Sequence, residues 1–234
     1  MYYDLHAYTS QSVGESSFDE MVSVAKRLGL SGLGVVRFPD QLHQPLPKAD
    51  IDIVNCVMVK ATTAAEMDDI VKKVRDKAEV VMVYGGNYDV NRAACSNPMV
   101  DVLCHPELGR PDSGLDHICM RAAQENKVAI ELNFHEVLDS FKRNRVHILA
   151  AMRKNVTLAR KYETPVITAS GALSKWGLRA GRELAALANI LGVELGKAVE
   201  SVSVVPESIV KANREKLAGK RWEGVSIVGE KHGP

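Results

Sequence analysis

Residues 100–134 read VDVLCHPELGRPDSGLDHICMRAAQENKVAIELNF, and this stretch decides the fold class. Two apolar runs, 100–104 and 128–132, have the length and continuity of strands that are buried on both faces. The spacing predicts a helix between them, with Ser113 and Asp116 as a capping pair at its start and Asn126 as its left-handed stop. A strand, a helix and a strand in this order form a βαβ unit, in which the strands run parallel and the crossover is right-handed.

Polar residues follow the first of these strands directly. Residues 105–112 read HPELGRPD, and they begin where that strand ends. Because α/β folds place their functional groups beyond the carboxyl ends of the strands, this segment is the first candidate for a functional site.

The same alternation of strands and helices extends in both directions. Further strands are expected at residues 2–6, 33–38, 51–59, 80–84 and 164–169. Helices are expected after Ser17 and Thr63, through Arg92, in a longer helical region after Leu132 that includes about 146–162, over 182–191, and twice more, the last begun by Pro206. Near-continuous apolar strands that alternate with helices predict a parallel sheet covered by helices.

A closed (β/α) barrel and an open doubly wound sheet both satisfy this pattern. The length of 234 residues fits one compact barrel, and polar residues follow many strands rather than one switch point. We therefore predict an α/β protein with a single TIM-like (β/α) barrel over residues 1–234, seven to eight parallel strands, surrounding helices and a loose tail at about 220–234. An eighth strand is not evident in the sequence.

The composition is that of an ordinary globular protein, with 46% apolar and 25% charged residues. No apolar run approaches the length of a membrane span, and the opening residues MYYDLHAYT lack the features of a signal peptide, which predicts a cytoplasmic protein without membrane contact. The cysteines show no C-x-x-C pairing, and buried reduced thiols are expected at Cys56, Cys95, Cys104 and Cys119.

The charges are segregated along the chain, although the net charge is only +1. Residues 142–182 contain ten Lys and Arg and a single acid, Glu163, so this segment carries +9 and the remaining residues sum to −8. Such segregation gives one side of the molecule a positive field, which suits a polyanionic partner.

Nucleotide-binding and common hydrolase motifs are missing from the sequence. It contains no G-x-x-x-x-G-K-[ST], no G-x-G-x-x-G, no H-E-x-x-H and no G-x-S-x-G. Two histidines stand at the ends of predicted strands instead: the segment DLHAYT contains His6, and VLCHP contains His105.

These segments resemble the polymerase-and-histidinol-phosphatase type of metallo-phosphoesterase barrel, with most of its metal ligands exchanged. Tyr8 stands in place of a second histidine, and Arg37 where an acid and a histidine are expected. In the late segment SGAL, Gly171 and Leu173 replace an aspartate and a histidine. Two imidazoles do not complete the ligands of a hydrolytic metal site, so we predict no metal bound by the protein and no catalytic residue.

Three longer segments make the resemblance more specific: the central block 100–134, residues 158–179 (LARKYETPVITASGALSKWGLR) and the opening DLHAYT. Over nearly its whole length the chain resembles the archaeal form of the thirty-kilodalton subunit of ribonuclease P, protein component 3. The resemblance implies a non-catalytic TIM-like barrel beside a catalytic RNA, in a ribonucleoprotein that removes the 5′ leader of precursor tRNA.

The resemblance also implies the partners. They are ribonuclease P RNA and a small ferredoxin-like protein subunit, often in a two-plus-two assembly, with precursor tRNA contacted indirectly. The phosphodiester is then hydrolysed by Mg²⁺ bound to the RNA, so this chain is expected to be a subunit of an endoribonuclease without a cofactor of its own.

A folded RNA is recognised mainly through phosphates, 2′-hydroxyls and shape, so scattered basic side chains suit the task. Motif position and charge select, as RNA or partner contacts, Arg92, Arg110, His117, Lys161 and Arg179, with Arg37 and Lys175 as weaker candidates.

Each of these candidates has a plainer explanation. The basic residues of the long helix, Lys161 among them, share one helical face that could simply be solvated. Arg110 could form only a local ion pair with Asp112, and His117 could merely pack near its helix start. Trp176 could be a core residue, or an exposed platform for a base or a partner.

Two rival functions remain at this point. The first is a stand-alone metal-dependent phosphoesterase, whose candidate ligands are His6, His105, Glu107 and Glu131. The second is a sugar-phosphate isomerase of TIM type, since glycine-rich ends of late strands can hold phosphate. No pair of an acid and a base stands out to support the isomerase.

Overall fold

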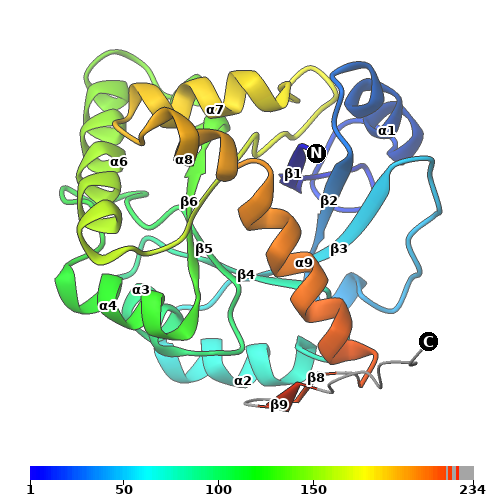
Figure 1. Ribbon diagram of the computed structural model, residues 1–234, viewed down its shortest axis with the longest axis horizontal. Coiled ribbons are helices and arrows are strands. Elements are labelled where there is room, and N and C mark those ends of the chain that lie inside the picture. Colours follow the sequence, from blue (N-terminus) through cyan, green and yellow to red (C-terminus); the bar gives the residue numbers. More distant parts are fainter. Residues whose placement is uncertain (220, 223–224, 227–234) are drawn as a thin grey trace, which may run out of the picture.

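Seven parallel strands form a nearly closed barrel in the computed structural model, which describes residues 1–219, 221–222 and 225–226. The strands pair in the order in which they occur along the chain, so each βα unit lies beside the next (Figure 1). This confirms the predicted TIM-like barrel with seven to eight strands. The strands are β1 (Tyr3–Ala7), β2 (Gly32–Arg37), β3 (Asp52–Val59), β4 (Val80–Tyr84), β5 (Val102–Cys104), β6 (Ala129–Asn133) and β7 (Val166–Ala169).

Helices surround the barrel in the order of the chain, as Figure 1 shows. The helical region expected after Leu132 consists of two helices: a short one comes first, and the longer one that contains residues 146–162 begins at Lys142. The helices are α1 (Phe18–Arg27), α2 (Ala64–Val74), α3 (Tyr88–Ser96), α4 (His117–Asn126), α5 (Phe134–Asp139), α6 (Lys142–Tyr162), α7 (Gly181–Ile190), α8 (Leu195–Glu200) and α9 (Val204–Leu217).

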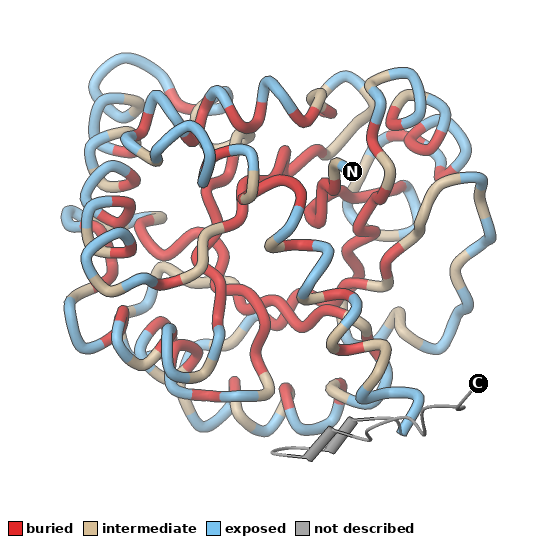
Figure 2. Tube along the Cα trace, viewed as in Figure 1, coloured by how far each residue is buried: buried red, intermediate tan, exposed pale blue. Residues whose placement is uncertain are grey.

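Two apolar layers hold the barrel together. Alternate strand residues such as Met58 and Met82 fill the interior, while their neighbours, Val57 and Val81, pack outward against the helices. In Figure 2 the strands are mostly buried, whereas buried and exposed residues alternate along the helices. The expected buried thiols are confirmed, since all four cysteines are buried and free.

The seam between β1 and β7 is closed by few backbone contacts. Near the carboxyl ends of the strands, Ala7 bridges Ala172, and the Asp4 side chain accepts the backbone N–H of Ser170 at 3.0 Å. At the amino ends, the carbonyl groups of Ser201 and Val202 accept from β7 and β1. The Asp4 side chain and the connection between the last two helices therefore accept hydrogen bonds from backbone N–H groups at the seam, which an eighth strand would otherwise have paired.

Helix α9 closes the end of the barrel at which the strands begin, and it crosses the strands in Figure 1. Val210 is buried in the interior cluster, and Asn213 donates to the Asp101 carboxylate at 2.7 Å. Arg214 binds Asp52 with two nitrogens and also reaches Glu79. The opposite end of the barrel, beyond the carboxyl ends of the strands, is therefore the end available for a functional site.

The ends of two helices differ from those expected from the sequence. Helix α4 is capped by Asp116, not by Ser113 with Asp116 as its partner, because the Asp116 carboxylate accepts from the backbone N–H groups of Ile118 and Cys119. The residue in the left-handed conformation at its end is Lys127, with φ +60°, not Asn126. Helix α9 begins at Val204, two residues before Pro206.

The expected loose tail lies largely outside the described residues. The described part of it has the strands β8 (Arg221–Trp222) and β9 (Val225–Ser226), which pair antiparallel. In the part of the chain that the structure describes, no helix combines the length and the apolar composition needed to cross a bilayer.

Candidate functional site: a buried His–Glu cluster and outer basic surfaces

Three side chains that can bind metals meet inside the barrel, near the carboxyl ends of its strands. They are His6 on β1, His105 directly after β5 and Glu131 on β6, which we call the mouth trio. One potential ligand atom from each lies within 4.8 Å of the others. The residues are almost inaccessible to solvent, with exposures of 1%, 6% and 1%. The prediction of no metal counted only the two imidazoles, whereas the rival phosphoesterase hypothesis had named all three residues among its candidate ligands.

His6 and Glu131 form a short buried ion pair, with Nδ1 and Oε1 2.7 Å apart. Burial by itself would lower the pKa of His6 and raise that of Glu131. The mutual attraction overcomes burial, so the pKa of His6 rises and that of Glu131 falls to about 2. The other ring nitrogen of His6 lies 3.1 Å from the hydroxyl of Tyr8, the residue that replaces a second histidine.

His105 is held in an uncommon backbone conformation, with φ +51°. Its Nδ1 lies 3.0 Å from Oε1 of Glu136, close enough for a charged contact, but this nitrogen makes no hydrogen bond of good geometry. Its ring lies beside those of His6 and Tyr84, with centroids 5.5 and 4.8 Å away. The backbone turn after β5 therefore directs the imidazole at the trio.

Two further carboxyl groups near the trio are only partly satisfied. Oε2 of Glu107 and Oδ2 of Asp4 are buried and have no hydrogen-bond partner. Burial raises the pKa of Glu107 to about 8, and the charges of Glu136 and Glu131 add to that rise. Burial likewise raises the pKa of Asp4. The site thus concentrates acidic groups in a place from which water is largely excluded.

The positions at which the resemblance expects further metal ligands now serve the fold. Arg37 is buried and donates to the carbonyl groups of Gln41 and Gln44 and to Asn55, so it anchors the loop after β2. Gly171 has φ +63°, and a Cβ there would collide with the side-chain amide of Asn133. Leu173 packs against the interior cluster. None of these three residues offers a ligand to the trio.

Three of the predicted contact residues lie close together on the outer surface of α3, α4 and the loop before α4. We call Arg92, Arg110 and His117 the α3–α4 basic patch. The Arg110 guanidinium lies over the ring of Tyr88, whose hydroxyl donates to Asp116 at 2.9 Å. Arg92 and His117 are exposed, and Lys154 of α6 is near enough to lower the pKa of Asp112.

Arg110 also forms the local ion pair that the plainer explanation expected. Its Nε and Nη2 donate to the two oxygens of Asp112 at 2.7 and 2.9 Å. This hydrogen bonding, with that from Gly114, lowers the pKa of Asp112 to about 2. Its Nη1 also donates to the Gly86 carbonyl at 3.3 Å, and 20% of the Arg110 side chain remains exposed.

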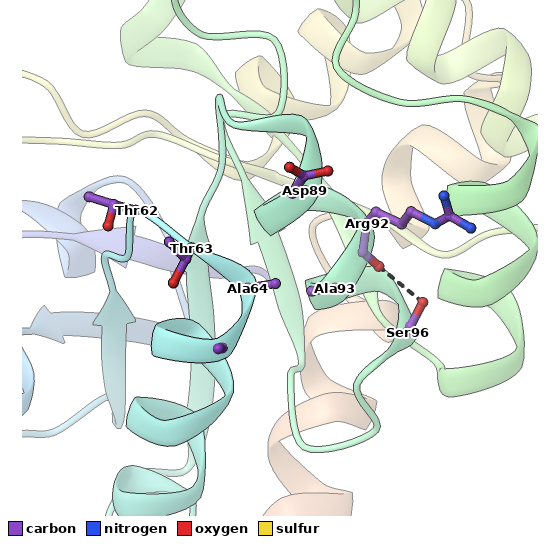
Figure 3. A pocket seen from close by; sticks show the side chains of 8 residues that line it. Thr62, Thr63, Ala64, Asp89, Arg92, Ala93 and Ser96 are labelled. Atoms are coloured by element: carbon purple, nitrogen blue, oxygen red, sulfur yellow. Dashed lines mark hydrogen bonds between the residues drawn. The ribbon is translucent and has the colours of Figure 1, made fainter.

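Arg92 also lines a shallow groove between the start of α2 and α3 (Figure 3). Its guanidinium points away from Thr62 and Thr63 and toward α4, and Asp89 lies at the edge of the groove. The positive charge of Arg92 therefore faces the outer surface beside α4 and does not face the inside of the groove.

A second group lies on the loop between β7 and α7. Trp176 is 78% exposed, which excludes a core role for it. Lys175 lies over its ring and pairs with Glu20. Arg179 lies over the ring of Phe134 and donates to the carbonyl groups of Trp176 and Leu178.

Lys161 lies apart from both groups, near the end of α6, where it is exposed over the ring of Tyr162. The other basic residues of that predicted helical face, Arg143, His147 and Lys154, are exposed as well. The structure thus brings Arg92, Arg110 and His117 together and Lys175 and Arg179 together, and it leaves Lys161 and the buried Arg37 separate.

Several residues of the buried cluster were not predicted from the sequence. Asp4, Tyr84 and Glu136 contact or influence the trio but were not among the candidates. Asp4 stands in the quoted DLH segment, and Tyr84 is the last residue of a predicted strand, so position at a strand end was an available signal for both. Glu136 lies on the short helix α5, inside the helical region expected after Leu132, and no sequence motif singles it out.

The fold and the site together define a class of protein: a TIM-like α/β barrel that encloses a His–Glu cluster and carries basic side chains on its outer helices and loops. Residues 1–218 match the family described as RNase P subunit p30. The chain belongs to this family, which confirms the resemblance seen in the sequence.

Curated relatives agree with this assignment. The chain is 35% identical over 221 residues to ribonuclease P protein component 3 of Methanosarcina barkeri, covering 93% of this chain and 92% of the relative. It is 34% identical over 242 residues to the protein of that name from Methanothermobacter thermautotrophicus, covering 98% and 96%.

Solved structures support the family assignment in one case and the fold in another. A chain of a cryo-EM structure of archaeal ribonuclease P with mature tRNA superimposes with a TM-score of 0.76 at 27% identity, covering 99% of this chain and all of that one. A Xaa-Pro dipeptidase with bound methionine superimposes with a TM-score of 0.59 at 14% identity and 91% of this chain covered, a likeness of fold alone.

Proposed function

We propose that this chain works as a non-catalytic protein subunit of ribonuclease P, the ribonucleoprotein that removes the 5′ leader of precursor tRNA. The observation that carries the proposal is the match, over nearly the full length of both chains, to a subunit of an archaeal ribonuclease P structure. The family and the curated relatives point to the same particle.

In this proposal, the phosphodiester is hydrolysed by Mg²⁺ bound to the RNA. The burial of the mouth trio supports this division of labour, because a catalytic metal site keeps a coordination position open to its substrate. An RNA phosphodiester cannot reach side chains that are as enclosed as His6 and Glu131. The stand-alone phosphoesterase is disfavoured for the same reason.

The proposed contacts with the RNA or with a protein partner are the α3–α4 basic patch, Lys161, and the loop with Lys175 and Arg179. Arginine and lysine neutralise phosphates, and an exposed tryptophan beside them offers a stacking surface. For Arg37 we propose a role in holding the loop after β2, since its two terminal nitrogens already have acceptors within the chain.

The partners proposed from the family are ribonuclease P RNA and a small ferredoxin-like subunit, in a two-plus-two assembly located in the cytoplasm. Exposed apolar side chains beside the basic ones, Phe141 and Val146 at the start of α6 and Trp176 on its loop, support a protein contact in addition to an RNA contact.

The test is reconstitution of precursor-tRNA cleavage from the RNA and the protein subunits, with this chain present or left out. We expect omission to reduce cleavage, and the double variant Arg110→Ala/Arg179→Ala to reproduce part of that loss. A plot of log affinity for the RNA against log salt has a negative slope. In the double variant we expect this slope to be less steep by about 2, or about 1 for each phosphate that is no longer neutralised.

A matched control is Lys72→Ala/Lys73→Ala, which removes two exposed basic residues at the end of α2, away from the proposed contacts. This control should leave both cleavage and the salt slope unchanged. Full cleavage by the Arg110/Arg179 variant would show that the contact assignment is wrong, and full cleavage without the chain would refute the proposed function.

A further inference from the structure

The buried cluster at the barrel mouth holds more negative than positive groups. Four carboxyl groups gather there, from Asp4, Glu107, Glu131 and Glu136, against the two imidazoles of His6 and His105. Among the described residues, no lysine or arginine forms an ion pair with any of these carboxyl groups. Buried charge of one sign is costly unless a cation or a proton compensates for it.

From this cluster we infer a binding site for a single divalent transition-metal ion, held by His6, His105 and Glu131. Two imidazole nitrogens and a carboxylate oxygen within 4.8 Å of one another match the ligand set of Zn²⁺ and related first-row ions. The hard ion Mg²⁺ is not expected to compete, since it prefers oxygen ligands in an octahedral shell.

The surrounding contacts suit metal-bound histidines. A neutral His6 can donate from Nε2 to the Tyr8 hydroxyl, which leaves the Nδ1 lone pair, now 2.7 Å from Glu131, for the ion. The ion then takes the place of the proton between these two side chains. Glu136, 3.0 Å from Nδ1 of His105, occupies the place of the carboxylate that orients a metal-bound imidazole.

Unpartnered polar atoms provide a second, independent indication. Oε2 of Glu107 and Oδ2 of Asp4 are buried without a hydrogen-bond partner, and both residues are at least 95% buried. Native proteins rarely leave such atoms unsatisfied. A cation held by the mouth trio compensates the negative charge of both carboxyl groups, which lie near enough to interact electrostatically with Glu131 and His6.

The role assigned to this ion is structural and not hydrolytic. Its three ligands come from β1, from the residue directly after β5 and from β6, so the ion would link strands on both sides of the seam between β1 and β7, at the end that α9 leaves open. The burial of all three ligands denies a substrate any access. The inference is therefore independent of the proposed function and is tested on the isolated chain without RNA.

The first measurement uses the full chain, stripped with a chelator and then dialysed against micromolar Zn²⁺ or, separately, millimolar Mg²⁺. We expect about one zinc per chain to be retained and no magnesium. The zinc affinity should fall at least about 100-fold in His105→Gln and in Glu131→Gln, and about 10- to 100-fold in Glu136→Gln.

Matched controls are His43→Gln and His147→Gln, two exposed histidines away from the trio, which should bind zinc as the unaltered chain does. Because a ligand variant could misfold, Co²⁺ is bound to the unaltered chain as well. Visible absorption bands of Co²⁺ with mixed imidazole and carboxylate ligands, removed by one equivalent of Zn²⁺, are the expected result. Zinc retention below about 0.1 per chain, or retention that persists in folded His105→Gln and Glu131→Gln, would overturn the inference.

Discussion

At the scale of single residues, Arg110 is a basic side chain whose direction is set by its neighbours. Asp112 holds the guanidinium through two hydrogen bonds, and Tyr88 supports it from below. Both partners are protein groups on the surface, so they fix the direction of the arginine without burying its charge. An arginine ordered in this way loses less entropy when it binds a phosphate than a freely moving side chain would.

The Asp112 pair should contribute little to stability, and its contribution should depend on acid pH. The folded pKa of Asp112, about 2, lies below the unfolded value of about 3.9, so the unfolded chain binds more protons between these values. The stabilisation is therefore present above about pH 4 and is lost as the pH falls toward 2. Because the pair is exposed, Asp112→Asn should lower the free energy of unfolding at pH 7 by less than about 1 kcal/mol.

Urea unfolding between pH 3 and pH 7 measures the difference in free energy of unfolding between the unaltered chain and Asp112→Asn. This difference should become smaller as the pH is lowered. A difference that grows toward pH 3 would contradict the assigned direction of the pKa shift.

At the scale of one element, helix α4 shows that the residue spacing of a capping motif does not decide which residue caps. Ser113 and Asp116 both suit an N-cap, and they stand three residues apart. In the structure, the Ser113 carbonyl accepts from Asn155 of α6 and its hydroxyl donates to Leu115, so Ser113 belongs to the loop. Asp116 therefore caps the helix, and its carboxylate also accepts a hydrogen bond from the Tyr88 hydroxyl.

Removing the cap should destabilise the protein by an amount typical of such groups. Asp116→Ala exposes two backbone N–H groups of α4 and should lower the free energy of unfolding by about 1 kcal/mol, within about 0.5–2 kcal/mol. Asp116→Asn keeps a side-chain oxygen at the cap and should cost less.

Denaturant unfolding of both variants gives the comparison, with Asp69→Ala, an exposed acid in the middle of α2, as the control. If Asp116→Ala unfolds at the same denaturant concentration as the unaltered chain, another group caps α4.

At the scale of the whole molecule, α9 covers the end of the barrel at which the strands begin. The amino ends of β3 and β4 bring Asp52 and Glu79 next to Arg214, and Asp101, just before β5, receives Asn213. These contacts join the last described helix to strands that lie more than a hundred residues earlier in the chain. Closure of the barrel therefore depends on residues far apart in sequence.

Arg214→Ala should weaken this closure. It leaves two partly buried carboxylates without their partner, and we expect a loss of about 1–3 kcal/mol in the free energy of unfolding, as for hydrogen bonds to charged groups. The control Lys211→Ala removes an exposed lysine from the same helix and should change stability by less than about 0.5 kcal/mol. Equal stability of the two variants, measured by thermal and denaturant unfolding, would show that these ion pairs do not hold α9 in place.

Much of the fold was predictable, and less of the site. The strands from β1 to β7 were found in order because their apolar runs are short, continuous and separated by turn residues. The cap of α4 was misplaced, because two suitable side chains compete for it and only tertiary contacts decide between them. In the site, His6, His105 and Glu131 were named together only as candidate ligands of the rival phosphoesterase, and the prediction of no metal counted the two histidines alone. A glutamate inside an apolar strand does not reveal which neighbours it meets across the barrel.

By itself, the sequence determined the alternation of strands and helices, the barrel class, the family and the segment in which basic charge gathers, because these depend on local periodicity and on motif spacing. Only the tertiary structure decided that α9 closes one end, that Arg37 is used within the fold, that Trp176 is exposed, and that His6, His105 and Glu131 meet in a buried cluster. Each of these outcomes depends on which strands become neighbours and on how the barrel curves. Those are properties of the closed sheet, and no single segment of the chain contains them.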